Sequence, residues 1–438
     1  MATTAKKKLP FEVWALIAGA FTIALGYGVV APVLPQFAQE FGVSSFAATA
    51  VISSFALSRL IFAPVAGGIV TKLGERTTYV TGLLIVATMT GAAVFVGEYW
   101  QLLLSRGLAG IGSSMFSIAS TALMIKVMPA AQRGQVAGMN SAAFLLGNLL
   151  GPVLGALVAG WGLRAPFIVY FFTLLAAALV VGIALRRSTN IGVAAGEHLL
   201  PPQTFREAFR VRQYRGALLS TFSFGWAIFG VRISAVPLFV AGALGGGGRE
   251  SGWVLAAYAA GNAVFVIPSG RWNDKIGRKP LLVTGFALST IAFIVFPLTT
   301  SIPLAMATLA LAGVAAACAN PAQQAVIADV VGKRGGGQVV AAGQMSADLG
   351  GILGPLIAGI LIDTVSYQAA FWLTAVLLGI TTVVWIFTPD SRVLNDADIT
   401  AEATIVSPTE PETGPITLPL EDELPGEKPV TDDDPEPR

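Results

Sequence analysis

The sequence holds very few of the residues that build metal sites and hydrolytic active sites. Among its 438 residues there is one cysteine, Cys318, and one histidine, His198. A single cysteine cannot form an internal disulfide, and one histidine with one cysteine is too few for a His/Cys metal cluster. A zinc enzyme and a Ser-His-Asp hydrolase are excluded on this count. We therefore predict no enzyme, no metal and no cofactor.

Charged side chains are also scarce. They make up 12% of the chain, whereas an average soluble domain carries about 25%. Hydrophobic residues account for 54%, and the mean hydropathy is +0.73. This composition excludes an ordinary soluble protein. It predicts an all-α polytopic membrane protein that lies in the lipid bilayer and has no nucleic-acid partner.

The few charges are divided unevenly along the chain. From Pro389 onward there are 14 acidic and 3 basic residues, a net charge of −11, while the preceding part carries +13. The end of the chain is also rich in proline and poor in aromatic residues, so it cannot bury enough apolar surface to fold. We predict a disordered acidic tail over residues 389–438.

Apolar windows long enough to cross a bilayer recur along the chain. A helix needs about 20 apolar residues to span the hydrocarbon layer. Six charge-free windows have this length: 13–39, 77–97, 134–163, 165–185, 251–270 and 364–389. The stretch 280–328 divides into two spans before Pro303, and four more windows each carry one central charge, at Arg59, Arg106, Arg232 or Asp348. The sequence predicts twelve transmembrane helices.

The loops between these spans alternate in positive charge. If the N-terminus is cytoplasmic, 22 Lys and Arg residues face the cytoplasm, 2 face the outside and 3 lie within spans. By the positive-inside rule, both termini are then cytoplasmic. We expect a multi-pass protein of the cell membrane, present as a monomer.

An internal repeat divides the chain into two halves. A shift of 203 residues superimposes Gly67 on Gly270, Gly74 on Gly277, and Gly151-Pro152 on Gly354-Pro355. The same shift relates Lys126 to Asp329, which we expect at cytoplasmic helix ends as gate-stabilising groups. Such repeats are typical of transporters with two pseudo-symmetric six-helix bundles. The predicted order is an N-terminus (1–10), a first bundle (11–187), a linker (188–215), a second bundle (216–388) and the tail.

Three local motifs carry a resemblance to a known family. The segment 270–279 (GRWNDKIGRK) resembles the loop signature of the major facilitator superfamily, and 67–76 is its weaker copy. The segment 104–112 around Arg106 resembles its arginine motif, and 147–155 (GNLLGPVLG) its antiporter motif. The first copy departs from the pattern, with Thr71 where the second has Asp274 and with Glu75 where a basic residue is usual.

The resemblance implies a transporter related to the drug:proton antiporters, and it implies two sets of conformational residues. The gating loop set is Gly270, Asp274, Gly277, Arg278, Lys279, Gly67, Gly74 and Arg76. The helix-bending set is Gly147, Gly151, Pro152, Gly155, Gly354 and Pro355, for which ordinary small-residue packing is the alternative.

Asp348 is the carboxylate placed near the centre of a span, and it is the candidate proton carrier. A lone charge at this depth is costly and is usually functional, so it faces a partner or a cavity. The alternative is a permanent ion pair with Arg232 or another arginine. For Arg106 the resemblance implies a role in proton coupling, and a structural arginine is the alternative.

The remaining candidates belong to a substrate cavity. Arg59 and Arg232 are deep charges, so with Arg106 and Asp348 they would leave one cavity with a net charge of +2. This favours anionic, zwitterionic or neutral solutes over simple cations. Aromatic and amide side chains that are candidates to line the cavity are Tyr27, Phe224, Trp226, Asn320, Gln323 and Gln324. For the aromatic residues the alternative is contact with lipid or packing in the core, whereas buried amides need partners.

Together these features predict a secondary active transporter that exports a small molecule, a drug or a metabolite, by proton antiport with alternating access. No P-loop sequence is present for ATP-driven transport. Two alternatives are a proton-coupled importer of an organic anion or nutrient, and a membrane receptor or lipid-moving protein without coupled solute exchange.

Overall fold

The computed structural model describes residues 11–127, 133–185, 204–331 and 337–391. Within these ranges, the side chains at 121, 124–127, 133–138, 140–142, 145, 274 and 337 lie outside the description. The predicted tail beyond residue 391 and most of the predicted linker also fall outside it. The described residues form helices joined by short turns and contain no strand.

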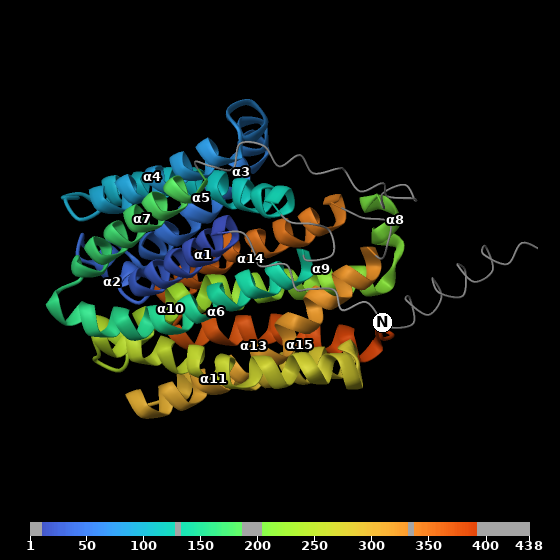
Figure 1. Cartoon of the computed structure of the whole chain (residues 1–438). Helices are drawn as coiled ribbons and strands as arrows, with labels where there is room; N and C mark the ends of the chain where they lie inside the picture. Colours follow the sequence, from blue (N-terminus) through green and yellow to red (C-terminus); the bar gives the residue numbers. More distant parts are fainter. Residues whose placement is uncertain (1–10, 128–132, 186–203, 332–336, 392–438) are drawn as a thin grey trace, which may run out of the picture. The chain divides into compact units, whose positions relative to one another are not determined.

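The first half of the described chain, residues 11–185, consists of six long helices and one short one (Figure 1). They are α1 (Phe11–Val30), the short α2 (Leu34–Gln39), α3 (Ser45–Leu73), α4 (Glu75–Ala92), α5 (Tyr99–Val127), α6 (Arg133–Val158) and α7 (Ala165–Ala184). The first predicted window is interrupted between α1 and α2. Pro32 and Pro35 lie at this turn, and proline lacks the N–H that would continue a helix.

The second half, residues 204–391, opens with a short helix inside the predicted linker. The elements are α8 (Phe205–Arg210), α9 (Arg212–Phe224), a π-helical segment (Gly225–Val231), α10 (Arg232–Gly242), α11 (Gly248–Ile276), α12 (Arg278–Val295), α13 (Ile302–Val331), α14 (Gly337–Thr364) and α15 (Tyr367–Phe387). Thr204 and Glu207 form a capping box at the start of α8. From α9 through α10 the chain runs as one apolar segment, Arg212–Gly242.

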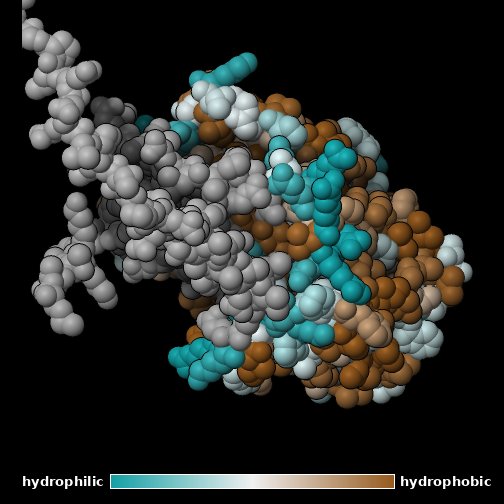
Figure 2. Space-filling view, turned by 90° about the vertical axis from the view of Figure 1, so that its right-hand side faces the viewer, coloured by the Kyte–Doolittle hydropathy of each residue, from teal (hydrophilic) through white to brown (hydrophobic). Residues whose placement is uncertain are grey.

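Ten helical segments in the described residues are long and apolar enough to cross a membrane. The predicted windows 77–97 and 134–163 fold as α4 and α6, which are not among these ten. Large apolar side chains such as Phe95, Phe172 and Phe387 are exposed, and Figure 2 shows wide areas of hydrophobic residues on the surface. Such extensive apolar surface is suited to contact with lipid.

Each half has its own buried core. One cluster of buried apolar residues runs from Leu16 to Leu185, with Ile233 as the single contribution from the second half. The other runs from Ala217 to Trp385. Two separate cores are what the internal repeat predicts for two helix bundles.

The halves meet along α3 with α14 and along α6 with α11. The hydrogen bonds between them gather at the end where α3 begins and α14 ends, which we call the closed end. There the Asp363 carboxylate accepts the backbone N–H groups of Ser45 at 2.9 Å and Phe46 at 2.7 Å. Gln36 Nε2 donates to the Pro237 carbonyl at 3.0 Å and to Ser251 Oγ at 2.9 Å.

Further contacts between the halves lie along α3 toward its other end, Leu73. Ser53 Oγ donates to the Ile352 carbonyl at 2.8 Å, and the Arg59–Asp348 pair lies beyond it along α3. An added Cβ at Gly67 of α3 or Gly270 of α11 would meet no atom within 4 Å. We call this end, where α3 and α11 have open space at Gly67 and Gly270, the open end.

Candidate functional site

The predicted proton carrier, Asp348, lies between the two halves. Its Oδ1 is 3.9 Å from Arg59 Nη2 on α3, which is the partner that the sequence left open. Gln344 Nε2, one turn earlier on α14, donates to the same oxygen at 3.2 Å. The Arg59 and Asp348 side chains remain 34% and 19% exposed. This carboxylate is therefore partly open to its surroundings and held by an ion pair across the halves.

Arg106 of α5 is far more deeply buried, with 3% of its surface exposed. Its guanidinium carbon lies 4.9 Å from the centre of the Phe55 ring on α3, which is cation–π geometry. Its Nε and Nη1 have no hydrogen-bond partner among the described residues. A buried charge with unmet donors is costly, and each of these two nitrogens could still donate to an acceptor.

Arg232 follows the π-helical segment directly. Its Nε donates to the Ile228 carbonyl at 3.1 Å, and its guanidinium carbon lies 4.1 Å from the centre of the Tyr258 ring on α11. π-helical segments are rare and concentrate at functional sites. Arg232 therefore lies next to a local helix irregularity, the π-helical segment, which no sequence pattern predicted.

Tyr27 of α1 connects these groups. Its side chain lies within electrostatic range of Arg106, Arg232 and Arg59, and its ring is 6.5 Å from that of Phe55. The structure thus brings five predicted site residues into one neighbourhood: Tyr27, Arg59, Arg106, Arg232 and Asp348. We call this group, with Phe55, Tyr170 and Tyr258, the arginine cluster.

Three members of the arginine cluster were missed by sequence reasoning. Tyr170 of α7 lies within electrostatic range of both Arg106 and Tyr27. Tyr258 and Phe55 each stack against an arginine. A tyrosine hydroxyl in an otherwise apolar span was the only available signal for Tyr170 and Tyr258, and Phe55 gave none.

The predicted amides do not all lie together. On α13, Gln323 Nε2 donates to Asn320 Oδ1 at 3.1 Å, and Gln323 is buried with no partner for its Oε1 in the described part of the chain. Gln324 is exposed instead. No described hydrogen bond joins these amides to the arginine cluster.

Phe224 and Trp226 belong to the core of the second half. Trp226 Nε1 donates to Thr374 Oγ1 on α15 at 3.1 Å, and the Phe224 ring packs on Phe229 with centroids 5.7 Å apart. Both side chains thus have partners within their own bundle.

The second-half loop motif starts inside a helix. Residues 270–276 are the last turns of α11, so the expectation of a loop there was wrong. The helix ends at Gly277, whose φ of +116° favours glycine. In the first half, residues 67–73 likewise belong to α3, which ends at Gly74 with φ +78°. The side chain of Asp274 lies outside the described residues.

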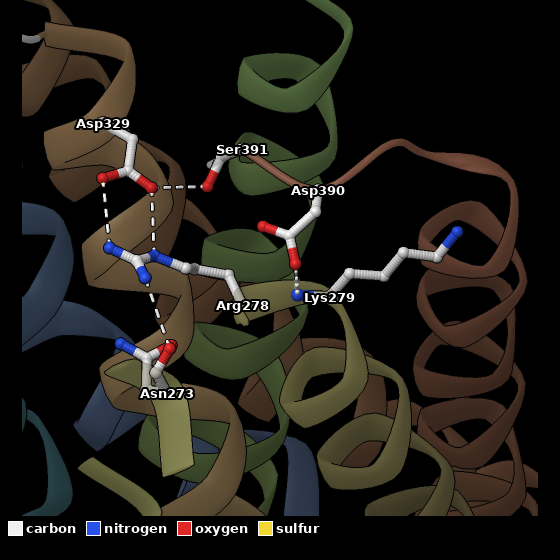
Figure 3. Close-up of polar contacts among 6 residues, drawn as sticks. All are labelled: Asn273, Arg278, Lys279, Asp329, Asp390 and Ser391. Carbon is white, nitrogen blue, oxygen red and sulfur yellow. Dashed lines mark hydrogen bonds and ion pairs between the residues drawn. The ribbon is translucent and has the colours of Figure 1, made fainter. Parts of the chain in front are cut away.

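Arg278 anchors a polar network at the end of the second-half motif (Figure 3). Its Nε donates to Asp329 Oδ2 at 3.1 Å and its Nη2 to Oδ1 at 3.4 Å. Ser391 Oγ donates to Asp329 Oδ2 at 2.6 Å, and the Lys279 backbone N–H donates to Asp390 Oδ2 at 3.2 Å. Asp329 is buried rather than facing a loop. The network ties α12 to the end of α13 and to the segment after α15.

The first-half copy of this motif makes a different contact. Arg76 Nη2 donates to the Gly182 carbonyl of α7 at 2.9 Å. The motif therefore ties helices within each half together in this conformation, through a carboxylate in the second half and a backbone carbonyl in the first.

The glycines of the antiporter motif bring helices into close contact. A Cβ at Gly151 of α6 would lie 2.7 Å from Gly28 Cα on α1, and one at Gly155 would lie 2.7 Å from the Val29 carbonyl oxygen. Gly147 faces Phe21 and Ala24 in the same interface. In the second half, a Cβ at Gly354 of α14 would lie 2.8 Å from the Trp226 carbonyl oxygen. Pro152 and Pro355 lie inside these same helices.

Comparison with known proteins gives a family match across most of the chain. The sequence profile of the Major Facilitator Superfamily matches residues 16–234 and 217–419. A relative named multi-drug resistance efflux pump PmrA homolog, from Lactococcus lactis, is 26% identical over 381 residues, which cover 84% of this chain and 92% of that protein. Multidrug resistance protein 2 of Bacillus subtilis is 26% identical over 393 residues, covering 84% and 94%.

Solved structures share the fold at low sequence identity. A bacterial homolog of the human lysosomal transporter Spinster, in an inward-facing and unoccupied conformation, has a TM-score of 0.74 and 17% identity, covering 88% of this chain and 97% of that one. A peptide transporter, POT, has a TM-score of 0.71 and 13% identity, covering 86% and 94%.

Proposed function

This chain belongs to the Major Facilitator Superfamily and is a membrane transporter, not an enzyme, and from this premise we propose that it exports a small molecule by proton antiport. The observation that carries the proposal is the Arg59–Asp348 ion pair, which joins the two halves at 3.9 Å in the middle of α3 and α14. The export direction is supported by relatives named as drug efflux pumps.

Alternating access is supported by the uneven contact between the halves. The hydrogen bonds of Asp363 and Gln36 hold the closed end, while α3 and α11 have open space around Gly67 and Gly270. In the predicted topology, with both termini cytoplasmic, the open end faces the cytoplasm. The structure would then correspond to the state that takes up solute from inside the cell.

Proton coupling is supported by the position of Asp348. While it is ionised, the carboxylate attracts Arg59 and holds α14 to α3. A proton on Asp348 removes that attraction, because a neutral carboxyl no longer pairs with a guanidinium. The two protonation states therefore favour different contacts between the halves, and a ligand can shift such an equilibrium only through a difference of this kind. No cofactor is needed, since the proton gradient supplies the energy.

We propose that the transporter lies in the cell membrane as a monomer. Its partners are the solute and the lipid bilayer. The import alternative uses the same fold and the same ion pair, with net solute flux in the opposite direction. The twelve-span topology and the domain boundaries 11–187, 188–215 and 216–388 belong to this proposal.

The test is solute-induced proton movement in everted membrane vesicles. A panel of amphiphilic cations, neutral drugs, sugars and organic anions is added after an inside-acid pH gradient has formed. We expect at least one class to discharge the gradient with the intact protein and none to do so with Asp348→Asn. No discharge by any class with the intact protein would contradict proton antiport.

Asp363→Asn is the matched control. Asp363 also joins α14 to α3, but it does so by accepting the backbone N–H of Ser45 at Oδ1 and that of Phe46 at Oδ2. An asparagine keeps one acceptor oxygen, so Asp363→Asn retains one of these two hydrogen bonds and weakens the contact between the halves without touching Asp348. We expect this variant to keep the discharge. Equal loss of the discharge in both variants would mean that the mutations act by weakening contact between the halves, not by removing the proton site at Asp348.

A further inference from the structure

We propose that the transported solute carries an acidic group and that this group binds Arg106. The solute class is an amphiphilic organic anion with a carboxylate, sulfonate or phosphate at one end and an aromatic body. This rests on the proposed function, because it names the solute of the same site.

Arg106 is the residue that indicates an anionic ligand. It is 97% buried, since only 3% of its surface is exposed, and its Nε and Nη1 have no acceptor among the described residues. An arginine stays charged even when buried, so it cannot relieve the cost by losing its proton. An acidic group supplies both the opposite charge and several acceptor lone pairs.

The neighbouring charges leave this requirement unmet. Asp348 is paired with Arg59 at 3.9 Å. Arg232 donates to the Ile228 carbonyl and stacks on Tyr258. Arg106 has the Phe55 ring on one side and no carboxylate partner in the described part of the chain. Three arginines with one carboxylate give the arginine cluster two excess positive charges, which repel a cationic solute.

The surroundings of Arg106 suit an aromatic acid. The guanidinium carbon of Arg106 lies 4.9 Å from the centre of the Phe55 ring, and the Tyr27 ring is next to Phe55. Tyr27 and Phe55 are only partly buried and their rings lie 6.5 Å apart. An aromatic body can therefore pack against these rings while its acidic end reaches the guanidinium.

Binding to the purified full-length protein tests this without a proton gradient. The probes are 1-naphthoate and 1-naphthalenesulfonate, with uncharged 1-naphthamide and the cation 1-naphthylmethylammonium as matched compounds of the same size. Binding is followed as the shift of the thermal unfolding midpoint with probe concentration. We expect each acid to produce a given rise of the unfolding midpoint at a concentration at least tenfold lower than the amide or the ammonium compound requires.

Arg106→Gln supplies the second measurement. We expect it to weaken the binding of both acids at least tenfold. We also expect the ligand-free variant to unfold at the same or a higher temperature, because an unpaired buried charge has been removed. A merely structural arginine predicts the reverse, since its loss would lower the midpoint.

Arg164→Gln is the matched control variant. Arg164 also stacks on a phenylalanine, 5.6 Å from the Phe37 ring centre, but its guanidinium donates to the carbonyls of Val94 and Val96. We expect this variant to bind the acids as the intact protein does.

Two results would overturn the proposal: naphthamide binding as tightly as naphthoate, or Arg106→Gln binding the acids unchanged. Neither bears on proton antiport, which the gradient measurement tests separately. Conversely, Asp348→Asn can lose proton coupling and still bind naphthoate.

Discussion

Arg59 of α3 and Asp348 of α14 form the ion pair that joins the two halves, with 3.9 Å between Nη2 and Oδ1. The internal repeat places Asn262 and Leu145 at the equivalent positions, so the pair has no symmetry-related copy. The equivalents of Arg106, Arg232 and Tyr27 are Leu309, Val29 and Gly230. The helical scaffold is therefore repeated, whereas the polar site is built once from both halves.

The ion pair predicts that Arg59 is as necessary as its partner. Arg59→Gln leaves Asp348 without a cation, and we expect the initial transport rate to fall roughly tenfold, equivalent to about 1.4 kcal/mol. The double variant Arg59→Asp with Asp348→Arg restores an ion pair between the halves. It should recover part of the free energy of contact between the halves that Arg59→Gln loses. Arg249→Gln, at an exposed position of α11, serves as the control. A rate for Arg59→Gln equal to that of Arg249→Gln would remove the pair from the mechanism.

The close contact at Gly151 predicts a strong size limit. A side chain there would meet Gly28 Cα at 2.7 Å from its first carbon, and overpacking of this kind costs about 1–3 kcal/mol. We expect Gly151→Leu to lower both the thermal midpoint and the turnover. Gly160→Ala, where an added Cβ meets nothing within 4 Å, should change neither. Normal turnover in Gly151→Leu would leave the antiporter motif without a role in this chain.

The network at Asp329 predicts which residues after α15 are needed for stability. Ser391 Oγ donates to Asp329 near the end of α13, and the Asp390 carboxylate accepts the backbone N–H of Lys279 at the start of α12. Truncation after Thr388 removes both hydrogen bonds, and we expect a loss of about 1–3 kcal/mol of stability. Truncation after Ser391 keeps both residues and should leave the thermal midpoint and transport unchanged. Equal stability of the two truncated chains would contradict a structural role for this network.

The repeat also predicts an ion pair with exchanged charges. Arg278 and Asp329 pair at 3.1 Å in the second half, and the equivalent residues of the first half are Glu75 and Lys126. The side chain of Lys126 lies outside the described residues, so this expectation comes from the repeat. Glu75→Lys should lower the thermal midpoint by placing like charges together, and adding Lys126→Glu should restore it. Effects that simply add in the double variant would argue against a pair.

Much of the scaffold could be predicted from the sequence because membrane helices are set by composition. Lipid leaves backbone groups no partner outside the helix, so long apolar windows become helices whatever their neighbours. The glycines at 151 and 354 were readable for the same reason, since small residues at fixed spacing permit close helix contact. The break between α1 and α2 was not anticipated, although Pro32 and Pro35 give its physical cause.

The site was predictable mainly as a set of charges, to which Tyr27 was added as a candidate. Their cost in lipid singled out Asp348, Arg106, Arg59 and Arg232, but the choice of Arg59 as partner depends on how α3 packs on α14. The Trp226 indole donates to Thr374 of its own bundle, and Trp226 lies in a π-helical segment. Neither feature could be read from hydropathy.

The measurement that tests proton coupling at Asp348 most directly compares two modes of transport in the same proteoliposomes. Uphill uptake of a solute driven by a pH gradient requires the proton, whereas exchange of labelled for unlabelled solute requires only alternating access. We expect Asp348→Asn to abolish the uphill uptake and to retain the exchange. Uphill uptake by Asp348→Asn at the rate of the intact protein would contradict proton coupling at Asp348.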